Sequence, residues 1–276
     1  MTMKAGPQLR HAASSKRSRR MIAILELLAE RESVSLTEFS YTLGVSPATV
    51  RRDLADLDRQ RLLRRTHGGA KVIDSQAELP VALRDTQYLE AKRSIAVEMA
   101  RLIPTHRHAV ALSGGSTTAQ VARALADHRD LTIITNSLTI ATLVSSYPNL
   151  KVIMTGGSLR PQSLELVGIL AENTFNAINV GTAILGTDGI TAAGGVTTHD
   201  DTEARTNHAM VTHAQRTIVV ADGSKVGRLA MAKVADINQV HALITDDTAA
   251  PGELAAIERA GVEVHVVPSR SAIVRH

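Results

Sequence analysis

Hydrogen-bonding side chains gather in segment 46–52 of this 276-residue chain. Ser46, Thr49, Arg51 and Arg52 lie within seven residues, and each can donate a hydrogen bond to a base edge or a phosphate oxygen. Arginine can also hold guanine through two bonds. In a helix-turn-helix unit, the first turns of the second helix reach the base edges. These residue types at this spacing therefore predict recognition of double-stranded DNA.

Two helix starts and a turn would position these side chains. Ser46 precedes Pro47, which places an N-cap serine before a proline at the first helical position, where the missing N–H costs nothing. Upstream, Ser35 and Glu38 have the spacing of a capping box, and Gly44 provides a turn between the two helices. Two short helices joined in this way form a helix-turn-helix unit.

The second predicted helix carries an apolar stripe, because Val50, Leu54 and Leu57 recur at helical spacing. Segment 61–70 predicts a hairpin, or wing, with arginines in front of a His-Gly-Gly sequence, and Lys16–Arg31 predicts a preceding helix. Arginines can also merely solvate a small helical domain, and a lone helix-turn-helix pattern is a weak signal. Three acidic residues of the second helix are expected to face solvent or other helices: Asp53, Asp56 and Asp58.

Three motifs in this region resemble the DNA-binding domain of DeoR-type transcriptional regulators. They are Arg19-Arg20-x-x-Ile, Val45-Ser46-x-x-Thr49-Val50-Arg51-Arg52-Asp53-Leu54 and Arg65-x-His67-Gly68-Gly69-Ala70. The resemblance implies a winged helix-turn-helix domain, which we assign to residues 19–74. The residues expected to contact DNA are Ser35, Ser46, Thr49, Val50, Arg51, Arg52, Arg65, His67 and Gly68.

Charge is unevenly distributed along the chain. Residues 1–71 contain 14 Lys/Arg and 7 Asp/Glu, a balance of +7, whereas the remaining residues contain 17 and 20, a balance of −3. A basic end on a mildly acidic body is typical of nucleic-acid binding by that end. Residues 1–18 are predicted to be a basic disordered tail, which either adds phosphate contacts or only improves solubility. Residues 75–89 lack clear periodicity and are predicted to be an interdomain linker.

Over residues 90–276, short apolar runs alternate with helical stretches, which predicts an α/β domain with a mainly parallel sheet covered on both faces. The predicted strands are 109–112, 131–135, 151–154, 180–185, 217–221, 242–245 and 262–267. The predicted helices are 92–102, 117–127, 138–146, 165–177, 202–214 and 251–260.

Small and hydroxyl-bearing residues follow several of these strands. In open α/β sheets, ligands bind beyond the carboxyl ends of the strands, and glycine and hydroxyl residues at a helix start suit a phosphate. Each loop alone could be a capped turn, and Asp201 could simply cap the helix that follows it. Their convergence on one rim favours a polyol phosphate. The predicted effector residues are Ser113, Gly115, Ser116, Thr117, Thr118, Asn136, Ser137, Gly156, Gly157, Asp188, Asp201, Glu203 and Lys225.

The second half of the chain also resembles the DeoR-type family, through SGGSTT, TNS, MTGGSLR, GTDGI, GGVTTHDDTEA and ADGSK. The resemblance implies a sensor domain similar in fold to ribose-5-phosphate isomerase. It also implies that residues 115–118 hold a phosphate, and that Asp201, Glu203 and Lys225 contact the polyol or carbonyl end. The chain departs from the family at Ser113, where Asp is common, and at Asn207, where Lys is common. Each departure removes a charge.

These observations predict a transcriptional regulator that represses a carbohydrate-metabolism operon, binds double-stranded operator DNA and responds to a phosphorylated sugar. Because symmetric operators mirror symmetric proteins, we expect a homodimer or homotetramer. The alternative is a sugar-phosphate isomerase-like enzyme carrying a DNA-binding domain, since Asp201, Glu203 and Lys225 could transfer protons. The lost charges at Ser113 and Asn207 argue against retained catalysis, so no enzymatic activity is predicted.

The amino-acid composition argues against several other kinds of site and protein. There is no cysteine for disulfides or thiolate metal sites, and 3 Tyr and 2 Phe are too few for a platform on which single-stranded bases stack. No apolar run is long enough for a membrane span, and no apolar core follows the basic N-terminus, so we expect a cytoplasmic protein. The 11 histidines are scattered, and His208 and His213 are expected at a helix surface, so neither a metal nor a cofactor is predicted.

Overall fold

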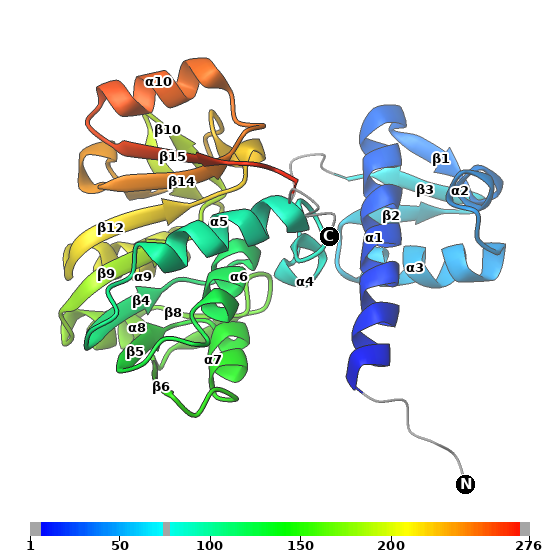
Figure 1. Cartoon of the computed structure of the whole chain (residues 1–276). Coiled ribbons are helices and arrows are strands. Elements are labelled where there is room, and N and C mark those ends of the chain that lie inside the picture. The colour runs from blue at the N-terminus through cyan, green and yellow to red at the C-terminus, as the bar shows by residue number, and fades with distance from the viewer. Residues whose placement is uncertain (1–6, 74–77, 271–276) are drawn as a thin grey trace, which may run out of the picture. The chain divides into compact units, whose positions relative to one another are not determined.

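The structure is a computed structural model that describes residues 7–73 and 78–270 (Figure 1). It contains two compact units, with the boundary between Gln87 and Tyr88. The first unit holds the predicted DNA-binding domain and the second holds the predicted sensor domain.

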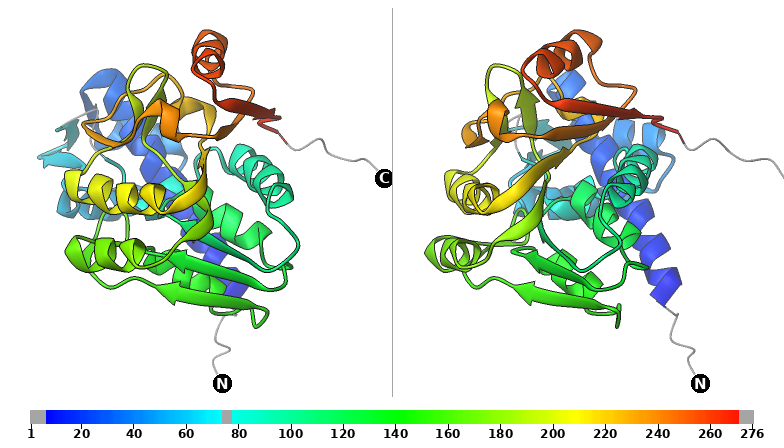
Figure 2. Two further views of the ribbon diagram at one scale, coloured as in Figure 1. Left: turned by 90° about the vertical axis from the view of Figure 1, so that its left-hand side faces the viewer. Right: turned by 60° about the vertical axis from the view of Figure 1, so that its left-hand side comes forward.

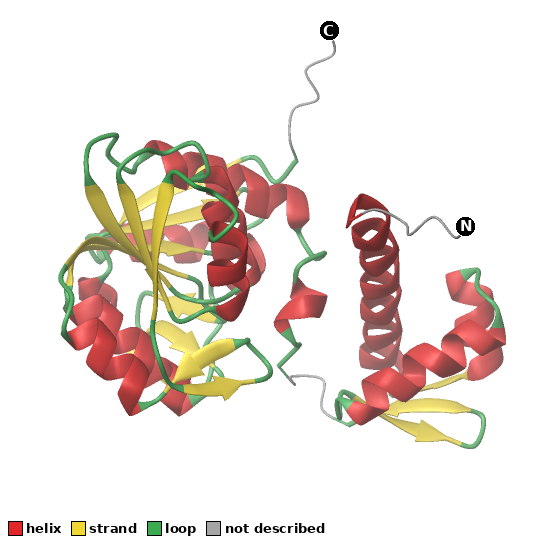
Figure 3. Cartoon of the chain, turned by 90° about the horizontal axis from the view of Figure 1, so that it is seen from below, coloured by secondary structure: helices red, strands yellow, loops and turns green. Residues whose placement is uncertain are grey.

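The first unit combines helices with a small antiparallel sheet (Figure 3). The strand order is β1-β3-β2, and β2 and β3 form the predicted wing hairpin, with Leu63 opposite Val72. The elements are α1 (Pro7–Arg31), β1 (Ser33–Ser35), α2 (Leu36–Leu43), α3 (Pro47–Arg59), β2 (Leu63–Thr66), β3 (Gly69–Val72) and α4 (Val81–Arg84).

One apolar core holds these elements together. The predicted stripe of α3 is buried in it, together with Ile24 and Leu28 of α1 and Phe39 of α2. Gly69 permits a close approach of β3 to β1, because a Cβ at this position would lie 2.1 Å from the carbonyl oxygen of Val34 on β1. The wing therefore needs glycine at position 69.

Asp53 is buried, where it joins α3 to α1. Its carboxylate accepts hydrogen bonds from the Nε atoms of Arg17, at 3.2 Å, and Arg20, at 2.5 Å. Of the two environments predicted for the acidic residues of this helix, Asp53 therefore faces another helix. Asp56 also contacts Arg17 of α1, and Asp58 accepts a hydrogen bond from the backbone N–H of Arg65 at 3.3 Å.

Two predictions at the edges of this unit need correction. Helix α1 begins at Pro7, so residues 7–18 of the predicted disordered tail are helical, and residues 1–6 lie outside the described residues. The predicted linker also contains structure, because α4 falls inside it and Leu83 is buried in the core of the first unit. A single short turn of helix has no periodic signal in the sequence, and its burial depends on contact with α1.

The second unit is built on a seven-stranded parallel sheet with the order β15-β14-β12-β9-β4-β5-β6. Helices cover both of its faces (Figures 1 and 2). The sheet strands are β4 (His108–Leu112), β5 (Leu131–Thr135), β6 (Leu150–Met154), β9 (Val180–Leu185), β12 (Ala214–Val220), β14 (Ala242–Asp246) and β15 (Glu263–Val267). The helices are α5 (Leu89–Arg101), α6 (Ser116–Ala124), α7 (Leu138–Val144), α8 (Ile169–Asn176), α9 (Asp201–Thr212) and α10 (Pro251–Arg259), with the short 3-10 turns η1 (Gly223–Lys225) and η2 (Ile237–Gln239).

Side chains alternate between two cores because successive strand residues point to opposite faces of the sheet. On β4, Val110 and Leu112 pack in the core beneath α5, α6 and α7, whereas Ala111 packs in the core beneath α8, α9 and α10. On β9, Ile184 faces the first core, and Ala183 and Leu185 face the second. The predicted α/β class with a covered parallel sheet is confirmed.

Short antiparallel strands were missed by the sequence prediction. They are β7 (Ser158–Arg160) with β8 (Glu165–Val167), and β10 (Gly189–Thr191) with β11 (Gly195–Thr198) and β13 (Ala232–Ala235). The predicted helix 165–177 is therefore wrong at its start, where β8 is followed by Gly168 at φ 89° and only then by α8. Strands of three or four residues are too short for a clear period-two pattern.

Candidate DNA interface and effector site

The N-terminal end of α3 is exposed and well capped. The Ser46 side chain accepts a hydrogen bond from the backbone N–H of Thr49 at 3.3 Å, and the hydroxyl groups of Ser46 and Thr49 lie 3.0 Å apart. Arg51 and Arg52 follow on exposed positions of the next turn. In the wing, Arg65, His67 and Gly68 are exposed as well.

The arginines of this unit fall into two groups. Arg17 and Arg20 bind Asp53, and Arg59 binds Asp56, so these three have carboxylate partners inside the protein. By contrast, five exposed arginines of α3 and segment 61–70 have no side-chain partner among the described residues: Arg51, Arg52, Arg61, Arg64 and Arg65. Guanidinium groups without an internal partner are available to DNA phosphates and guanine edges.

Two of the predicted DNA contacts have structural roles. Val50 is fully buried in the core of the first unit, so its expected contact with DNA is wrong. The apolar stripe had already predicted its burial. Ser35 caps α2 by accepting a hydrogen bond from the backbone N–H of Glu38 at 3.2 Å. Only half of the predicted capping box forms, because the Glu38 carboxylate binds Arg31.

The predicted effector residues lie mainly at the carboxyl ends of β4, β5, β6, β9 and β12. The strand order reverses between β4 and β9, because β5 and β6 extend the sheet on one side of β4 while β9 starts the other side. Such a switch point is where ligands bind in open α/β sheets. The loops after these two strands touch, since the backbone N–H of Gly186 donates to Ser113 Oγ at 2.9 Å.

The loop after β4 leads directly into α6. Gly115, at φ 123°, is its N-cap residue, and Thr118 Oγ1 donates to the Gly115 carbonyl at 3.0 Å. The backbone N–H groups of Ser116, Thr117 and Thr118 have no acceptor among the residues that the structure describes. Free N–H groups at the start of a helix favour an anion.

A polar cluster lies beside this loop. Thr198 Oγ1 is 2.7 Å from Glu203 Oε1 and 3.1 Å from Asp188 Oδ2, and Asp188 lies 3.7 Å from Lys225 Nζ. Arg160 of β7 binds Glu203 at 3.1 Å. The structure therefore brings together three of the residues predicted for the effector site: Asp188, Glu203 and Lys225.

The neighbouring acidic residues Asp200 and Asp201 have different roles. The side chain of Asp200 caps α9 by accepting a hydrogen bond from the backbone N–H of Glu203 at 2.9 Å. Although partial burial opposes ionisation, this hydrogen bond and the Arg160 guanidinium hold the pKa of Asp200 below its ordinary value. Asp201 is exposed at the first position of α9 and has no contact with the cluster among the described residues. The alternative role as a cap is wrong, because Asp200 is the N-cap residue, and the predicted effector contact of Asp201 stays a prediction.

Glu165 belongs to the same cluster and was missed by the sequence prediction. Its carboxylate accepts a hydrogen bond from the backbone N–H of Gly114 at 2.5 Å. Burial and the negative charge of Glu203 raise the pKa of Glu165 well above that of an ordinary glutamate. Gly168, placed inside the predicted helix, was the available signal that residues 165–167 form a separate element.

At the two positions where the chain departs from the family, Ser113 and Asn207, uncharged side chains make hydrogen bonds. Ser113 accepts from Gly186, and the buried Asn207 accepts from Asn136 Nδ2 at 3.3 Å. Asn136 Oδ1 is buried without a hydrogen-bond partner in the described part of the chain. Ser137 caps α7, and Gly156 and Gly157 follow β6 beside the β7–β8 hairpin, where a Cβ on Gly157 would lie 2.8 Å from the carbonyl oxygen of Val167.

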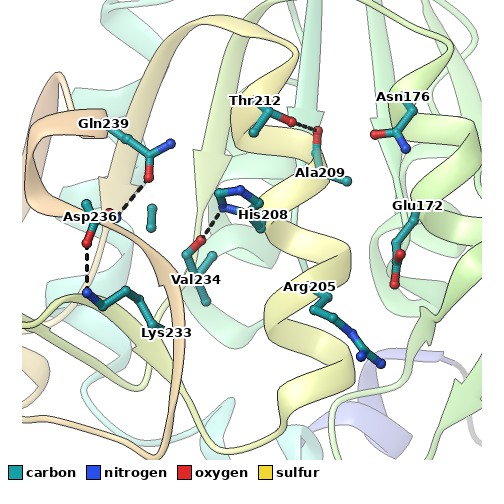
Figure 4. Close-up of a pocket in the computed structure, with 11 residues that line it drawn as sticks. Glu172, Asn176, Arg205, His208, Ala209, Thr212, Lys233, Val234, Asp236 and Gln239 are labelled. Carbon is teal, nitrogen blue, oxygen red and sulfur yellow. Dashed lines mark hydrogen bonds and ion pairs between the residues drawn. The ribbon is translucent and has the colours of Figure 1, made fainter.

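A separate pocket of about 480 Å³ lies between α8, α9 and segment 233–239 (Figure 4). Arg205, His208 and Lys233 contribute to it, but none of the predicted effector residues does. Lys233 binds Asp236 at 2.7 Å, and His208 Nδ1 lies 2.8 Å from the Val234 carbonyl. His208 is exposed, in accord with its expected place at a helix surface.

Two other kinds of feature are absent from residues 7–73 and 78–270. Within these ranges, no group of three or more histidine and carboxylate side chains is arranged to hold a metal ion. No described helix combines the length and the hydropathy needed to cross a membrane.

The chain matches two family models that together cover both units. The DeoR-like helix-turn-helix domain matches residues 20–76, and the DeoR C-terminal sensor domain matches residues 87–247. The chain belongs to the DeoR family. This DeoR-family protein is thus a DNA-binding transcriptional regulator, and the resemblance inferred from the sequence motifs is confirmed.

The similarity between this DeoR-family chain and its relatives covers most of the chain. It is 35% identical to the transcriptional regulator GlpR of Haloferax volcanii over 87% of this chain and 94% of the relative. It is 33% identical to the glycerol-3-phosphate regulon repressor of Escherichia coli K12 over 84% of this chain and 91% of that protein. Among solved structures, ribose 5-phosphate isomerase A of Neisseria gonorrhoeae is similar with a TM-score of 0.37 at 16% identity, over 51% of this chain and 53% of that one.

Proposed function

We propose that this DeoR-family protein is a repressor that binds operator DNA through α3 and the wing. The observation that carries the proposal is the group of arginines without internal partners on the exposed surfaces of α3 and the wing. Ser46 and Thr49 add hydroxyl groups at the start of α3, where base edges are reached in this motif. Relatives named as repressors support the direction of control.

A matched pair of substitutions on one helix tests the operator interface. Arg51→Ala removes a guanidinium without an internal partner, whereas Arg59→Ala removes one that is already bound to Asp56. If Arg51 contacts a base, Arg51→Ala should lower operator affinity by about 1–3 kcal/mol. If Arg51 contacts a phosphate, Arg51→Ala should instead reduce by about one the slope of log affinity against log salt concentration. Fluorescence anisotropy with labelled DNA from the region upstream of this protein's gene would measure the operator affinity of both variants. Arg59→Ala should bind this DNA as the parent protein does. Equal affinity of Arg51→Ala and the parent protein would contradict this assignment.

We further propose that the effector is a phosphorylated sugar or polyol bound at the switch point of the sheet. The free N–H groups at the start of α6 would hold the phosphate, and Lys225, Asp188 and Glu203 would contact the hydroxyl-bearing end. The name of the E. coli relative, a repressor of a glycerol-3-phosphate regulon, supports this ligand class. Operator release requires that the effector bind the two DNA-binding states with different affinity.

Thermal unfolding with matched pairs of compounds tests the effector. Ligands that bind only the folded state raise the unfolding midpoint in a concentration-dependent way. A phosphorylated sugar should raise it and the same sugar without phosphate should not. Lys225→Met should weaken the response, whereas Lys233→Met, in the separate pocket, should leave it unchanged. A midpoint insensitive to every phosphorylated compound would contradict the proposed ligand class.

We propose binding without turnover. Asp188 and Glu203 each have a cationic partner, Lys225 and Arg160 respectively, and Asp201 lies outside the cluster. A carboxylate held by a cation is a poor general base, because the ion pair stabilises its charged form. Isomerisation of ribose 5-phosphate by the purified protein would contradict this view and favour the enzyme alternative.

We also propose a homodimer or homotetramer in solution, because symmetric operators mirror the symmetry of the proteins that bind them. Sedimentation of the full chain at micromolar concentration measures this directly. A protein that sediments as a monomer and binds the complete operator as one chain per operator would exclude this oligomer.

A further inference from the structure

The carboxylate of Glu165 lies against the loop assigned to the effector's phosphate. Glu165 begins β8, which pairs with β7 in an antiparallel hairpin with Arg160 opposite Glu165. The hairpin is tied to the rim of the sheet, because Leu138 N donates to the Leu164 carbonyl at 2.9 Å and Leu166 N donates to the Asn136 carbonyl at 2.7 Å. These bonds place an acidic side chain from a separate element at the start of α6.

Contact between Glu165 and this loop is direct. The Gly114 backbone N–H donates to Glu165 Oε1 at 2.5 Å, and a Cβ on Gly114 would lie 2.4 Å from Glu165 Cγ. Gly114 therefore has to be glycine because Glu165 occupies the space where its side chain would be. The amide of Gly114, two residues before the first free N–H group of α6, is thus already bound to a carboxylate of the protein.

The surroundings of Glu165 disfavour a second negative charge. Glu165 is 2% exposed, and Glu203 approaches it from α9. Arg160 of β7 is the nearby cation, but it is shared between Glu203, at 3.1 Å, and Asp200, at 3.3 Å. Further along the cluster, Lys225 is paired with Asp188. Both of these cations therefore already compensate the charge of other carboxylates.

One buried group near the hairpin lacks a partner. Asn136 Oδ1 is buried without a hydrogen bond among the described residues, although the backbone carbonyl of Asn136 is bound by Leu166 of β8. An unsatisfied buried oxygen costs free energy, so it marks a place that a ligand hydroxyl can occupy at a gain. The β7–β8 hairpin therefore lies beside the Gly114 amide, which is bound to Glu165, and beside Asn136 Oδ1, which has no hydrogen-bond partner among the described residues.

We propose that Glu165 is an internal competitor for the effector's anionic group, so that a doubly charged ligand binds only when Glu165 takes up a proton or withdraws from Gly114. This inference rests on the phosphate site proposed above. A carboxylate on the Gly114 amide and an anion at the start of α6 lie on the same loop and repel each other strongly in a buried environment. Protonation removes the charge of Glu165, and the raised pKa of the buried carboxyl group lets it hold that proton at a higher pH than an ordinary glutamate does.

The proposal makes ligand binding depend on pH in a defined direction. Below the pKa of Glu165 in the free protein, the carboxyl group is already neutral and the anion binds without proton uptake. Above this pKa, each binding event must also take up a proton or break the Gly114 bond, so affinity falls as the pH rises. A neutral ligand would show no such dependence on Glu165.

Sulfate is a suitable probe, because it remains doubly charged throughout the range in which carboxyl groups titrate. We would titrate the full-length protein with sodium sulfate by calorimetry, at constant ionic strength set with sodium chloride, in two buffers of different ionisation enthalpy. The variants are Glu165→Gln, which keeps an oxygen acceptor for Gly114 but carries no charge, and Glu172→Gln on α8 as the matched control.

The parent protein and Glu172→Gln should bind sulfate more weakly as the pH rises and should take up protons above the pKa of Glu165. Glu165→Gln should bind with little pH dependence and without this proton uptake. At high pH it should bind about tenfold more tightly than the parent, which corresponds to about 1.4 kcal/mol. Equal affinity and equal proton uptake in the parent and Glu165→Gln would overturn the role of Glu165 while leaving the anion site in place. Absence of sulfate binding in all three proteins at every pH would overturn the anion site and this inference with it.

Folding of Glu165→Gln is checked in the absence of ligand. Because the folded state binds the proton of Glu165 more tightly than the unfolded state does, the parent protein should lose stability as the pH rises and the variant should not. A variant that unfolds cooperatively but shows the parent's pH dependence would also overturn the proposal, independently of any ligand.

Discussion

Lys92 and Asp222 form a buried ion pair whose removal has a calculable cost. Lys92 lies in the first turns of α5 and Asp222 precedes η1, with 3.8 Å between Nζ and Oδ2. Their side chains are 4% and 3% exposed. The Asp222 carboxylate also accepts hydrogen bonds from the backbone N–H of Ser224, at 3.2 Å, and from its hydroxyl, at 2.5 Å. Lys92→Met keeps the length of the side chain and removes its charge.

The expected loss follows from what remains buried. Breaking a buried pair by removing one partner costs about 3–5 kcal/mol, because the other charge stays uncompensated. Since Asp222 keeps the two bonds from Ser224 and the pair itself is 3.8 Å apart, we expect the lower end, about 3 kcal/mol. In the double variant Lys92→Met/Asp222→Asn no charge is stranded, so its loss should be about 1 kcal/mol.

Urea denaturation followed by circular dichroism measures these free energies of unfolding. Arg101→Met is the matched control on the same helix, because Arg101 is 72% exposed and its pair with Glu98 should contribute less than about 1 kcal/mol. The double variant should be more stable than Lys92→Met alone. If Lys92→Met costs no more than Arg101→Met, or if the two substitutions are additive, the pair does not stabilise the second unit.

Three further predictions concern other single positions. Asp53→Asn should lower the stability of the first unit by about 1–3 kcal/mol in urea, because the bonds from Arg17 and Arg20 lose their charged acceptor. Gly69→Ala should cost about 1–3 kcal/mol or more, since its Cβ would collide with the Val34 carbonyl, whereas Gly252→Ala on α10 has open space and should cost nothing. Glu165 has a raised pKa in the fold, so the folded state binds its proton more tightly than the unfolded state does. The free energy of unfolding should therefore fall as pH rises from the ordinary glutamate pKa through the folded pKa, by about 1.4 kcal/mol for each pH unit that separates the two values, and Glu165→Gln should abolish this trend in a pH series of urea titrations.

Local signals in the sequence were sufficient for much of the fold. Ser46 and Pro47 mark the start of α3 by chemistry that acts within one helical turn, and the structure places the helix there. Strands such as 131–135 could be predicted because fully buried strands of a parallel sheet are continuous apolar runs between helices. These signals depend on neighbours in the chain rather than on the final arrangement.

Features that depend on distant contacts could not be predicted in this way. Asp53 contacts Arg17 and Arg20 more than thirty residues away, and no local pattern distinguishes it from Asp58. Glu165 reaches Gly114 from 51 residues away through a three-residue strand. For the effector site, residue types indicated which loops take part, but the placement of the carboxylates follows from the path of the β7–β8 hairpin.

The central position of β4 has a consequence for biosynthesis. β4 is the first strand of the seven-stranded sheet to leave the ribosome, yet its partner on one side, β9, pairs Val110 with Thr182, about 70 residues later. At about 5–20 residues per second, this edge of β4 stays unpaired for several seconds of translation. An apolar strand with an open edge is a site of misassembly during that time. We therefore expect the nascent second unit to need protection from misassembly until β9 has been made. The first unit, whose core lies within residues 21–83, is by then already complete in sequence.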